Sequence, residues 1–115
     1  MPKKQHAVIK MTERVYRVII STEASDMLLN HIEFLANVSV SAARTLKNDL
    51  LAKIKNLEKT PYLYPVFYSD TLEPEYHKLI YKRYLVLYAI DEKKKTVSIE
   101  FVWDTRKDNT LTEEG

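Results

Sequence analysis

The first hydrophobic segment of the chain is the run VYRVII at residues 15–20, in which one arginine interrupts β-branched and aromatic residues. This composition predicts a mostly buried β-strand. Directly after it, Ser21 and Thr22 supply helix-capping oxygens, and Glu23 places negative charge in the first helical turn. A helix of about 14 residues is therefore predicted to follow, with one apolar face. That face comprises Ala24, Leu28, Ile32 and Leu35.

A second amphipathic helix is predicted after a polar break, where Ser39 or Ser41 can act as the N-cap. It is expected to run to about Glu58. Its apolar positions again share one face, so that the two helices form a hairpin: Ala43, Leu46, Leu50, Ile54 and Leu57. We interpret its opposite face as solvated surface, with a phosphate-binding ridge as the alternative. This polar face carries Arg44, Lys47, Asn48, Lys55 and Asn56.

A loop follows from Lys59 to Tyr76, because Thr60-Pro61 ends the helix and two further prolines interrupt any regular structure. Aromatic side chains rarely remain in water, so the aromatics of this loop are expected to pack back over the helical hairpin. A base-stacking platform is the alternative. The residues concerned are Tyr62, Tyr64, Phe67 and Tyr68.

Three strands are predicted in the remaining sequence, at residues 77–82, 84–91 and 96–103. The second is apolar on both faces, which is typical of a central strand. In the third, alternate residues predict one buried face made of Val97, Ile99, Phe101 and Trp103. Short polar links favour an antiparallel meander. The expected fold is α+β, in the order βααβββ: a helical hairpin packed on a small, mainly antiparallel twisted sheet.

The composition excludes several classes of site. The chain has 115 residues, one glycine, three histidines and no cysteine. One glycine argues against a glycine-rich phosphate loop, and the lack of cysteine excludes disulfides, thiolate metal sites and a cysteine nucleophile. His31-x-Glu33 is interpreted as helix surface, and we expect no metal and no cofactor.

The chain has no apolar run long enough to cross a bilayer, and its first residues lack the apolar core of a signal peptide. We therefore expect a cytoplasmic protein that does not bind membranes. Residues 12–108 are predicted to form a single domain. Residues 1–11 are expected to be a flexible lead, in which Met11 is an alternative start, and residues 109–115 a flexible tail.

Positive charge is unevenly distributed. The net charge is +2, but residues 77–107 carry eight Lys or Arg against four acids. Such a stretch can attract phosphate backbones or an acidic partner, although a solvated strand edge is the simpler interpretation.

Four segments together resemble the RelE/ParE superfamily of toxins, over residues 15–108. They are YRVIIS before an acidic helix start, LEKTP at residues 57–61, HKLIYKRYLVLYAID at residues 77–91, and WDTRKD at residues 103–108. The resemblance implies the toxin of a type II toxin-antitoxin system, of the plasmid stabilization type, that inhibits growth and is neutralised by a cognate antitoxin. RelE-like members cut messenger RNA in the ribosomal A site, whereas ParE-like members poison DNA gyrase. The target implied is therefore DNA gyrase or the ribosome with its mRNA.

The resemblance places the site at the end of the sheet. Arg106 matches a phosphate-contacting arginine of the nucleases, with a salt bridge to Asp104 or Asp108 as the alternative. Arg83 is the second candidate catalytic residue, and a solvated turn is its alternative. Candidate binding residues are Lys78, Lys82, Trp103 and Lys107. His77 could act as acid or base, but we interpret it as surface; Glu100 is expected to pair with Lys78 or Lys82.

Two positions depart from the nuclease pattern. Leu85 stands where RelE-like nucleases usually carry an arginine, and Thr112 stands where several carry a tyrosine. The possible activity as an mRNA interferase therefore stays open. The alternatives to a gyrase-directed toxin are an mRNA endoribonuclease of RelE type, a degenerate, non-toxic antitoxin-binding module, and an unrelated nucleic-acid-binding domain.

Overall fold

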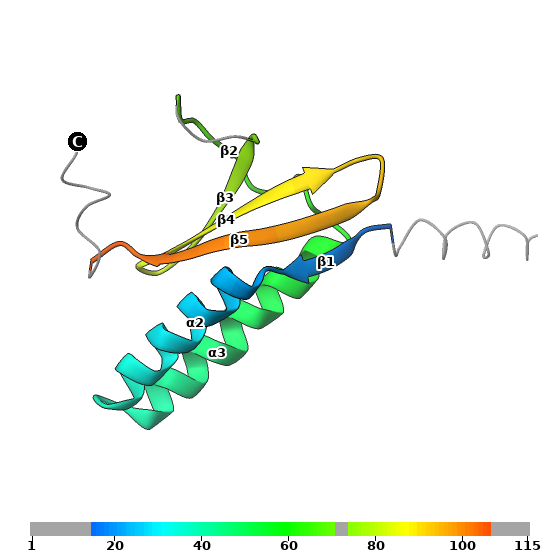
Figure 1. Cartoon of the computed structure of the whole chain (residues 1–115). Coiled ribbons are helices and arrows are strands. Elements are labelled where there is room, and N and C mark those ends of the chain that lie inside the picture. Colours follow the sequence, from blue (N-terminus) through cyan, green and yellow to red (C-terminus); the bar gives the residue numbers. More distant parts are fainter. Residues whose placement is uncertain (1–14, 71–73, 107–115) are drawn as a thin grey trace, which may run out of the picture.

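The molecule has two layers, a helical hairpin and a five-stranded sheet (Figure 1). A computed structural model of the chain describes residues 15–70 and 74–106. The helices are α2 (Thr22–Ala36) and α3 (Val40–Lys55), which continues into the 3-10 turn η1 (Asn56–Glu58). The strands are β1 (Arg17–Ile20), β2 (Val66–Phe67), β3 (Tyr76–Tyr81), β4 (Tyr84–Asp91) and β5 (Thr96–Asp104). The predicted lead, the predicted tail, Lys107 and Thr112 lie outside the described residues.

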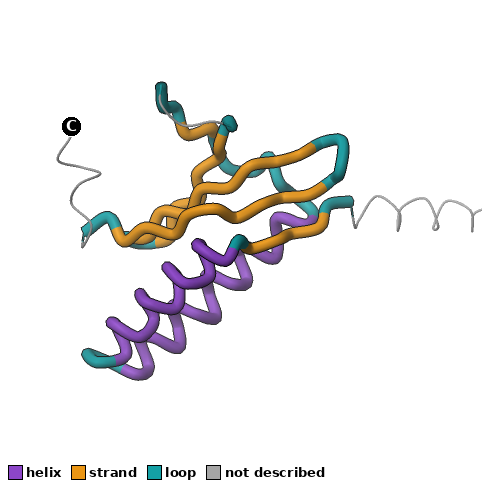
Figure 2. Tube along the Cα trace, in the orientation of Figure 1, coloured by secondary structure: helices purple, strands orange, loops and turns teal. Residues whose placement is uncertain are grey.

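The strand order is β1-β5-β4-β3-β2, with β4 in the centre as predicted. The pair of β1 and β5 is parallel, and the other pairs are antiparallel. Both helices lie on one face of this sheet (Figure 2). The predicted α+β fold with a mainly antiparallel sheet is thus confirmed. The structure also contains β2, which was not predicted. Its two residues are too few to show the alternation of apolar and polar residues that indicates a strand.

Serine side chains begin both helices. Ser21 Oγ accepts a hydrogen bond from the Ala24 N–H at 3.0 Å, and Ser39 Oγ accepts one from the Ala42 N–H at 3.1 Å. Each bond satisfies a donor that a helix start would otherwise leave unpaired. Of the two candidate caps for the second helix, Ser39 is therefore the one used.

The main core lies between the helices and the sheet. All five apolar positions predicted for α3 are buried, and Val86, Tyr88, Val97 and Ile99 meet them from the sheet. The Tyr88 hydroxyl donates a 2.7 Å hydrogen bond to the Pro61 carbonyl, and burial raises the pKa of this phenol to about 12. No helix in residues 15–70 and 74–106 is both long and apolar enough to cross a membrane.

The prediction that residues 15–20 form a mostly buried strand is wrong. β1 is the last strand at one side of the sheet, and Arg17, Ile19 and Ile20 are exposed. Val18 packs partly against the core. Amino-acid composition indicates that a segment favours a β-strand. The burial of that strand depends instead on whether another strand pairs with it on each side.

The predicted buried face of β5 is also wrong, because a β-bulge interrupts the alternation. Tyr88 pairs with Ile99 and Leu87 pairs with Phe101, so Glu100 is an extra residue. Before the bulge Val97 and Ile99 face the helices, and after it Val102 does. Phe101 and Trp103 consequently pack on the opposite face of the sheet.

The loop aromatics do not form the expected cover over the helical hairpin. Tyr64 packs against the main core, but Phe67 packs on the opposite face of the sheet. Tyr62 is exposed, and Tyr68 is 87% exposed. The difference arises because β2 turns the loop along the edge of β3 instead of over the helices.

Candidate functional site

The sheet face turned away from the helices, called the open face below, is apolar at its centre. Leu85 and Leu87 of β4 are buried there beneath aromatic neighbours. No helix among residues 15–70 and 74–106 covers this face (Figure 1). The side chains that pack on it are Phe67, Tyr76, Leu85, Leu87, Ala89, Phe101 and Trp103.

Three aromatic rings form an array on the open face. Phe101 and Trp103 are stacked with centroids 5.0 Å apart, and Tyr76 meets Phe101 edge-on at 5.7 Å. Burial, and secondarily Glu100, raise the pKa of Tyr76. The bulge at Glu100 creates the array, because it turns Phe101 and Trp103 to the side of Tyr76.

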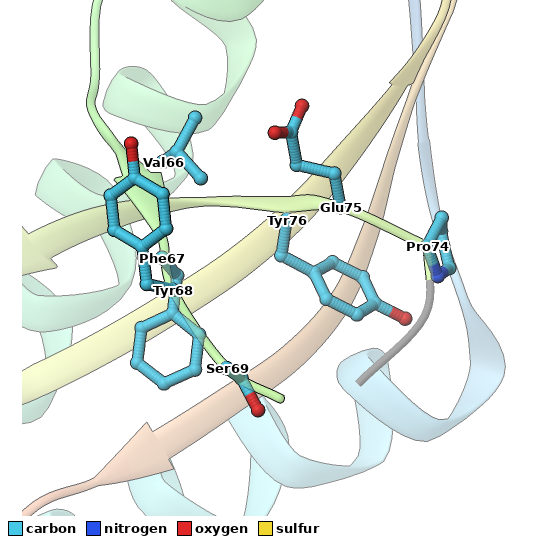
Figure 3. Close-up of a pocket in the computed structure, with 7 residues that line it drawn as sticks. All are labelled: Val66, Phe67, Tyr68, Ser69, Pro74, Glu75 and Tyr76. Carbon is cyan, nitrogen blue, oxygen red and sulfur yellow. The ribbon is translucent and has the colours of Figure 1, made fainter. Parts of the chain in front are cut away.

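Beside the array an open pocket lies between β2 and the start of β3 (Figure 3). Its lining residues include Phe67, Tyr68 and Tyr76, with Glu75 as the charged group. Residues 71–73, which connect its two walls, lie outside the described residues. The pocket extends the aromatic surface of the open face toward β2.

Arg83 holds a nearly buried ion pair at the end of the sheet. Its guanidinium lies 3.1 Å from Asp104 Oδ2 and stacks over the Tyr84 ring, with Cζ 5.4 Å from the centroid. Asp104 is 1% exposed. Its other oxygen accepts a 3.0 Å hydrogen bond from the Arg106 backbone N–H. Asp104 thus pairs with the guanidinium of Arg83, and Arg106 contacts the same carboxylate through its backbone N–H.

Of the other candidates, Lys82, Trp103 and Arg106 lie near the same end, whereas Lys78 lies further along β3, opposite Leu87. Lys82 occupies the turn before β4 with φ 55, a left-handed conformation that is uncommon outside glycine, and its Nζ lies 5.4 Å from the Tyr81 ring centroid. Arg106 is exposed just beyond β5. Trp103 and Lys78 belong to the open face, where Trp103 pairs in register with Leu85. Lys107 lies outside the described residues.

Both described histidines are packed, so the surface interpretations of His77 and His31 are wrong. His77 is 8% exposed, stacks on Tyr88 at 5.4 Å, and its Nδ1 lies 2.8 Å from the Tyr64 carbonyl oxygen. His31 is half-buried, and its Nε2 lies 2.7 Å from the Val102 carbonyl oxygen. The long-range partners could not be read from local periodicity. Among residues 15–70 and 74–106, no group of three or more His, Asp or Glu side chains could hold a metal ion.

A cluster that the sequence analysis missed joins three distant segments at the other end of the sheet. Glu92, in the turn between β4 and β5, accepts hydrogen bonds from the Tyr16 hydroxyl at 2.6 Å, from the Tyr62 hydroxyl and from Lys95 Nζ at 2.8 Å. These bonds lower the pKa of Glu92 to about 2, and the bond to Glu92 raises the pKa of Tyr62 to about 12. Tyr16 and Glu92 are 76 residues apart in sequence, so no local pattern predicts the cluster.

Glu92→Gln is expected to remove an acid-sensitive part of the stability. The folded-state pKa of about 2 lies below the ordinary value of 4.5, so Glu92 stabilises the fold above pH 4.5 and loses this contribution as the pH falls toward 2. The difference in melting temperature between wild type and the variant should shrink over this range. Thermal unfolding followed by circular dichroism at several pH values measures it. Glu33→Gln, on the exposed surface of α2, is the matched control, and a difference that stays constant down to pH 2 would contradict the prediction.

One family model matches most of this chain. The family model described as the ParE toxin of the type II toxin-antitoxin system parDE matches residues 18–109. A search among curated proteins finds no match. The matched region contains both helices, every strand apart from the first residue of β1, and every described candidate residue of the site.

Proposed function

The chain belongs to the ParE toxin family of type II toxin-antitoxin systems, and from this premise we propose that it arrests bacterial growth by binding DNA gyrase, without cutting RNA. The family implies an antitoxin as partner. The proposed place of action is the cytoplasm, where gyrase acts. Plasmid stabilization is the proposed role of the pair.

The observation that carries this proposal is the apolar centre of the open face. Cutting RNA through its 2′-hydroxyl needs a base, a cation at the phosphate and an acid for the leaving oxygen. Leu85, 9% exposed, occupies the position where a RelE-like nuclease carries arginine. Arg83 is held by Asp104, and His77 packs on the helix side of the sheet against Tyr88. Such a surface favours protein binding over nucleophilic chemistry.

The open face is the proposed antitoxin surface. Stacked aromatics over leucines resemble the buried centre of protein interfaces, in which aromatic residues are enriched. An amphipathic helix laid on this face would cover the array, and its polar edge would meet Lys78 and Arg106. A mixed-charge or acidic antitoxin segment would complement the basic stretch of residues 77–107.

Paired assays of gyrase supercoiling and ribosome-dependent RNA cleavage test the proposal. The wild-type protein is expected to inhibit supercoiling and to leave mRNA intact. Arg106→Ala should abolish the inhibition if the end of β5 contacts the target, whereas Arg44→Ala, an exposed arginine of α3, should not. Cleavage of mRNA with unaffected supercoiling would overturn the gyrase assignment. If Arg106→Ala still inhibited supercoiling, the surface that contacts the target would lie elsewhere on the molecule.

A non-toxic antitoxin-binding module is the second candidate, supported by the departure at Leu85. In that case expression of the soluble protein without antitoxin would leave growth unchanged, while antitoxin binding would persist. Growth arrest on induction would exclude this candidate.

A further inference from the structure

We propose that the antitoxin segment covering the open face carries opposite charges on its two flanks: a Lys or Arg that pairs with Glu100 of β5, and an Asp or Glu that pairs with Lys78 of β3. This inference rests on the proposed antitoxin surface and adds the chemistry of the segment that binds there. It narrows the partner from an acidic or mixed-charge segment to one whose acidic flank lies toward β3 and whose basic flank lies toward β5.

The strand register places Lys78 and Glu100 on the open face, on either side of its apolar centre. Lys78 pairs with Leu87, and Leu87 pairs with Phe101. Directly opposed residues of neighbouring strands share a face, so Lys78 lies on the same side as Leu87 and Phe101. Glu100 is the extra residue of the bulge, and its charge helps to raise the pKa of Tyr76. Its carboxylate therefore lies near the phenol of the aromatic array.

Both side chains are half-buried, and within residues 15–70 and 74–106 neither forms an ion pair. The expected pairing of Glu100 with Lys78 or Lys82 is therefore wrong. Lys78 and Glu100 stand on strands that β4 separates, about 10 Å apart at two strand spacings. Lys82 lies instead against the Tyr81 ring. The open face thus presents two unpaired charges of opposite sign across an apolar centre.

A half-buried charge favours a partner of opposite charge once a second molecule covers it. In the free toxin, water solvates the exposed part of both groups. A segment that covers the aromatic array would remove much of this water, and a charge left unpaired in the interface would lower the affinity. Opposite charges on the segment would replace the lost interactions and would disfavour partners that carry the wrong sign.

An open pocket beside Glu100 has room for the cationic side chain. Ala89 and Ser98 line it on the open face, and the turn between β4 and β5 completes it. Its charged lining residues are Asp91, Glu92, Lys93 and Glu100. Glu92 is already paired with Lys95, so two acids face one lysine and the pocket remains negative. A guanidinium or ammonium group of the antitoxin would neutralise it.

The dimensions suit an amphipathic helix that lies along β4. A helix with its side chains is about 10–12 Å across, and β3 and β5 are about 10 Å apart. A helix over Leu87 would therefore present one flank to Lys78 and the other to Glu100. Because the two flanks differ in charge, a given segment fits in one direction and not in the reverse direction.

Charge reversal on the toxin tests the pairing, with purified cognate antitoxin as the probe in isothermal calorimetry. Glu100→Lys and Lys78→Glu should each weaken binding about tenfold or more, because each sets like charges face to face. Glu100→Gln keeps the shape of the side chain and should weaken binding less. Glu33→Lys makes the same charge change as Glu100→Lys on the exposed surface of α2 and should leave binding unchanged. Circular dichroism should first show that each variant is folded.

A compensating change in the antitoxin tests the contact itself. Each Lys and Arg of the antitoxin is replaced in turn by Glu, and each product is titrated against the wild-type toxin and against Glu100→Lys. One of these antitoxin variants should bind Glu100→Lys about tenfold more tightly than the unchanged antitoxin does, since it restores opposite charges. If none does, the proposed pairing at Glu100 is wrong.

The Trp103→Ala variant separates a failure of the charged flanks from a failure of the surface. If Trp103→Ala loses binding while Glu100→Lys and Lys78→Glu bind like wild type, the antitoxin covers the open face without paired flanks. Tighter binding by Glu100→Lys would also overturn the pairing, because the segment would then be acidic on both flanks. If all three variants bind like wild type, the antitoxin lies elsewhere and the proposed surface is wrong as well.

Discussion

Arg83→Ala is expected to lower the free energy of unfolding by about 3 kcal/mol, because it removes the guanidinium that pairs with the almost fully buried carboxylate of Asp104. The side chain of Asp104 is 2% exposed and that of Arg83 is 28% exposed, so nearly all of the desolvation falls on the carboxylate. The Arg106 backbone N–H would still donate a hydrogen bond to this carboxylate. Urea unfolding of both proteins, followed by circular dichroism, measures the difference.

The double variant Arg83→Ala with Asp104→Ala should recover part of this loss, since it leaves no buried charge. Arg106→Ala, whose side chain is exposed, should change the stability by less than about 0.5 kcal/mol. The comparison separates a structural arginine from a contact residue. If Arg83→Ala kept wild-type stability but lost growth arrest, Arg83 would act on the target and the ion pair would be incidental.

The helical layer could be predicted nearly completely, because the spacing of apolar residues along a helix shows which of its faces is buried. The five apolar positions of α3 and η1 recur with the helical period, and all five are buried. The Ser21 cap and the start of α2 are equally local. Strand β4 was placed correctly for a similar reason: apolar residues on both faces require neighbours on both faces.

The strands that were misread depend on partners far away in the chain. The burial of β1 depends on its place at the edge of the sheet, which nothing within RVII encodes. The bulge at Glu100 depends on how Leu87 and Tyr88 meet β5. An extra residue reverses every later side chain of a strand, and this one reversal moved Phe101 and Trp103 from the expected core to the open face.

The placement of Arg83 and Arg106 near one end of the sheet follows from the order of the strands and could be predicted, but their contacts could not. The partner of Arg83, however, lies 21 positions later, at Asp104, and two residues in such a pair leave no periodic signal. The Glu92 cluster has the same property over longer separations. Side-chain pairs between distant parts of the chain form only in the folded structure. They can be identified only once the register of the strands is known.

Trp103→Ala is expected to weaken binding of the cognate antitoxin by about 30-fold or more, the effect of losing a central aromatic anchor worth about 2 kcal/mol. Trp103 is half-buried, stacks on Phe101 and lies beside Leu85, so its ring covers the apolar centre of the open face. Because the partner would bury the exposed side of the same ring, alanine would remove contacts from both molecules at once. Titration of purified toxin with antitoxin by isothermal calorimetry gives the ratio of dissociation constants.

Phe34→Ala is the matched control for this change, since it removes an exposed aromatic ring from α2, in the other layer of the molecule. Circular dichroism should first show that both variants are folded. If Trp103→Ala bound the antitoxin as tightly as wild type while Phe34→Ala did not, the antitoxin surface would lie on the helices. The aromatic array on the sheet would then be free for the target even in the neutralised complex, and neutralisation would have to act without covering it.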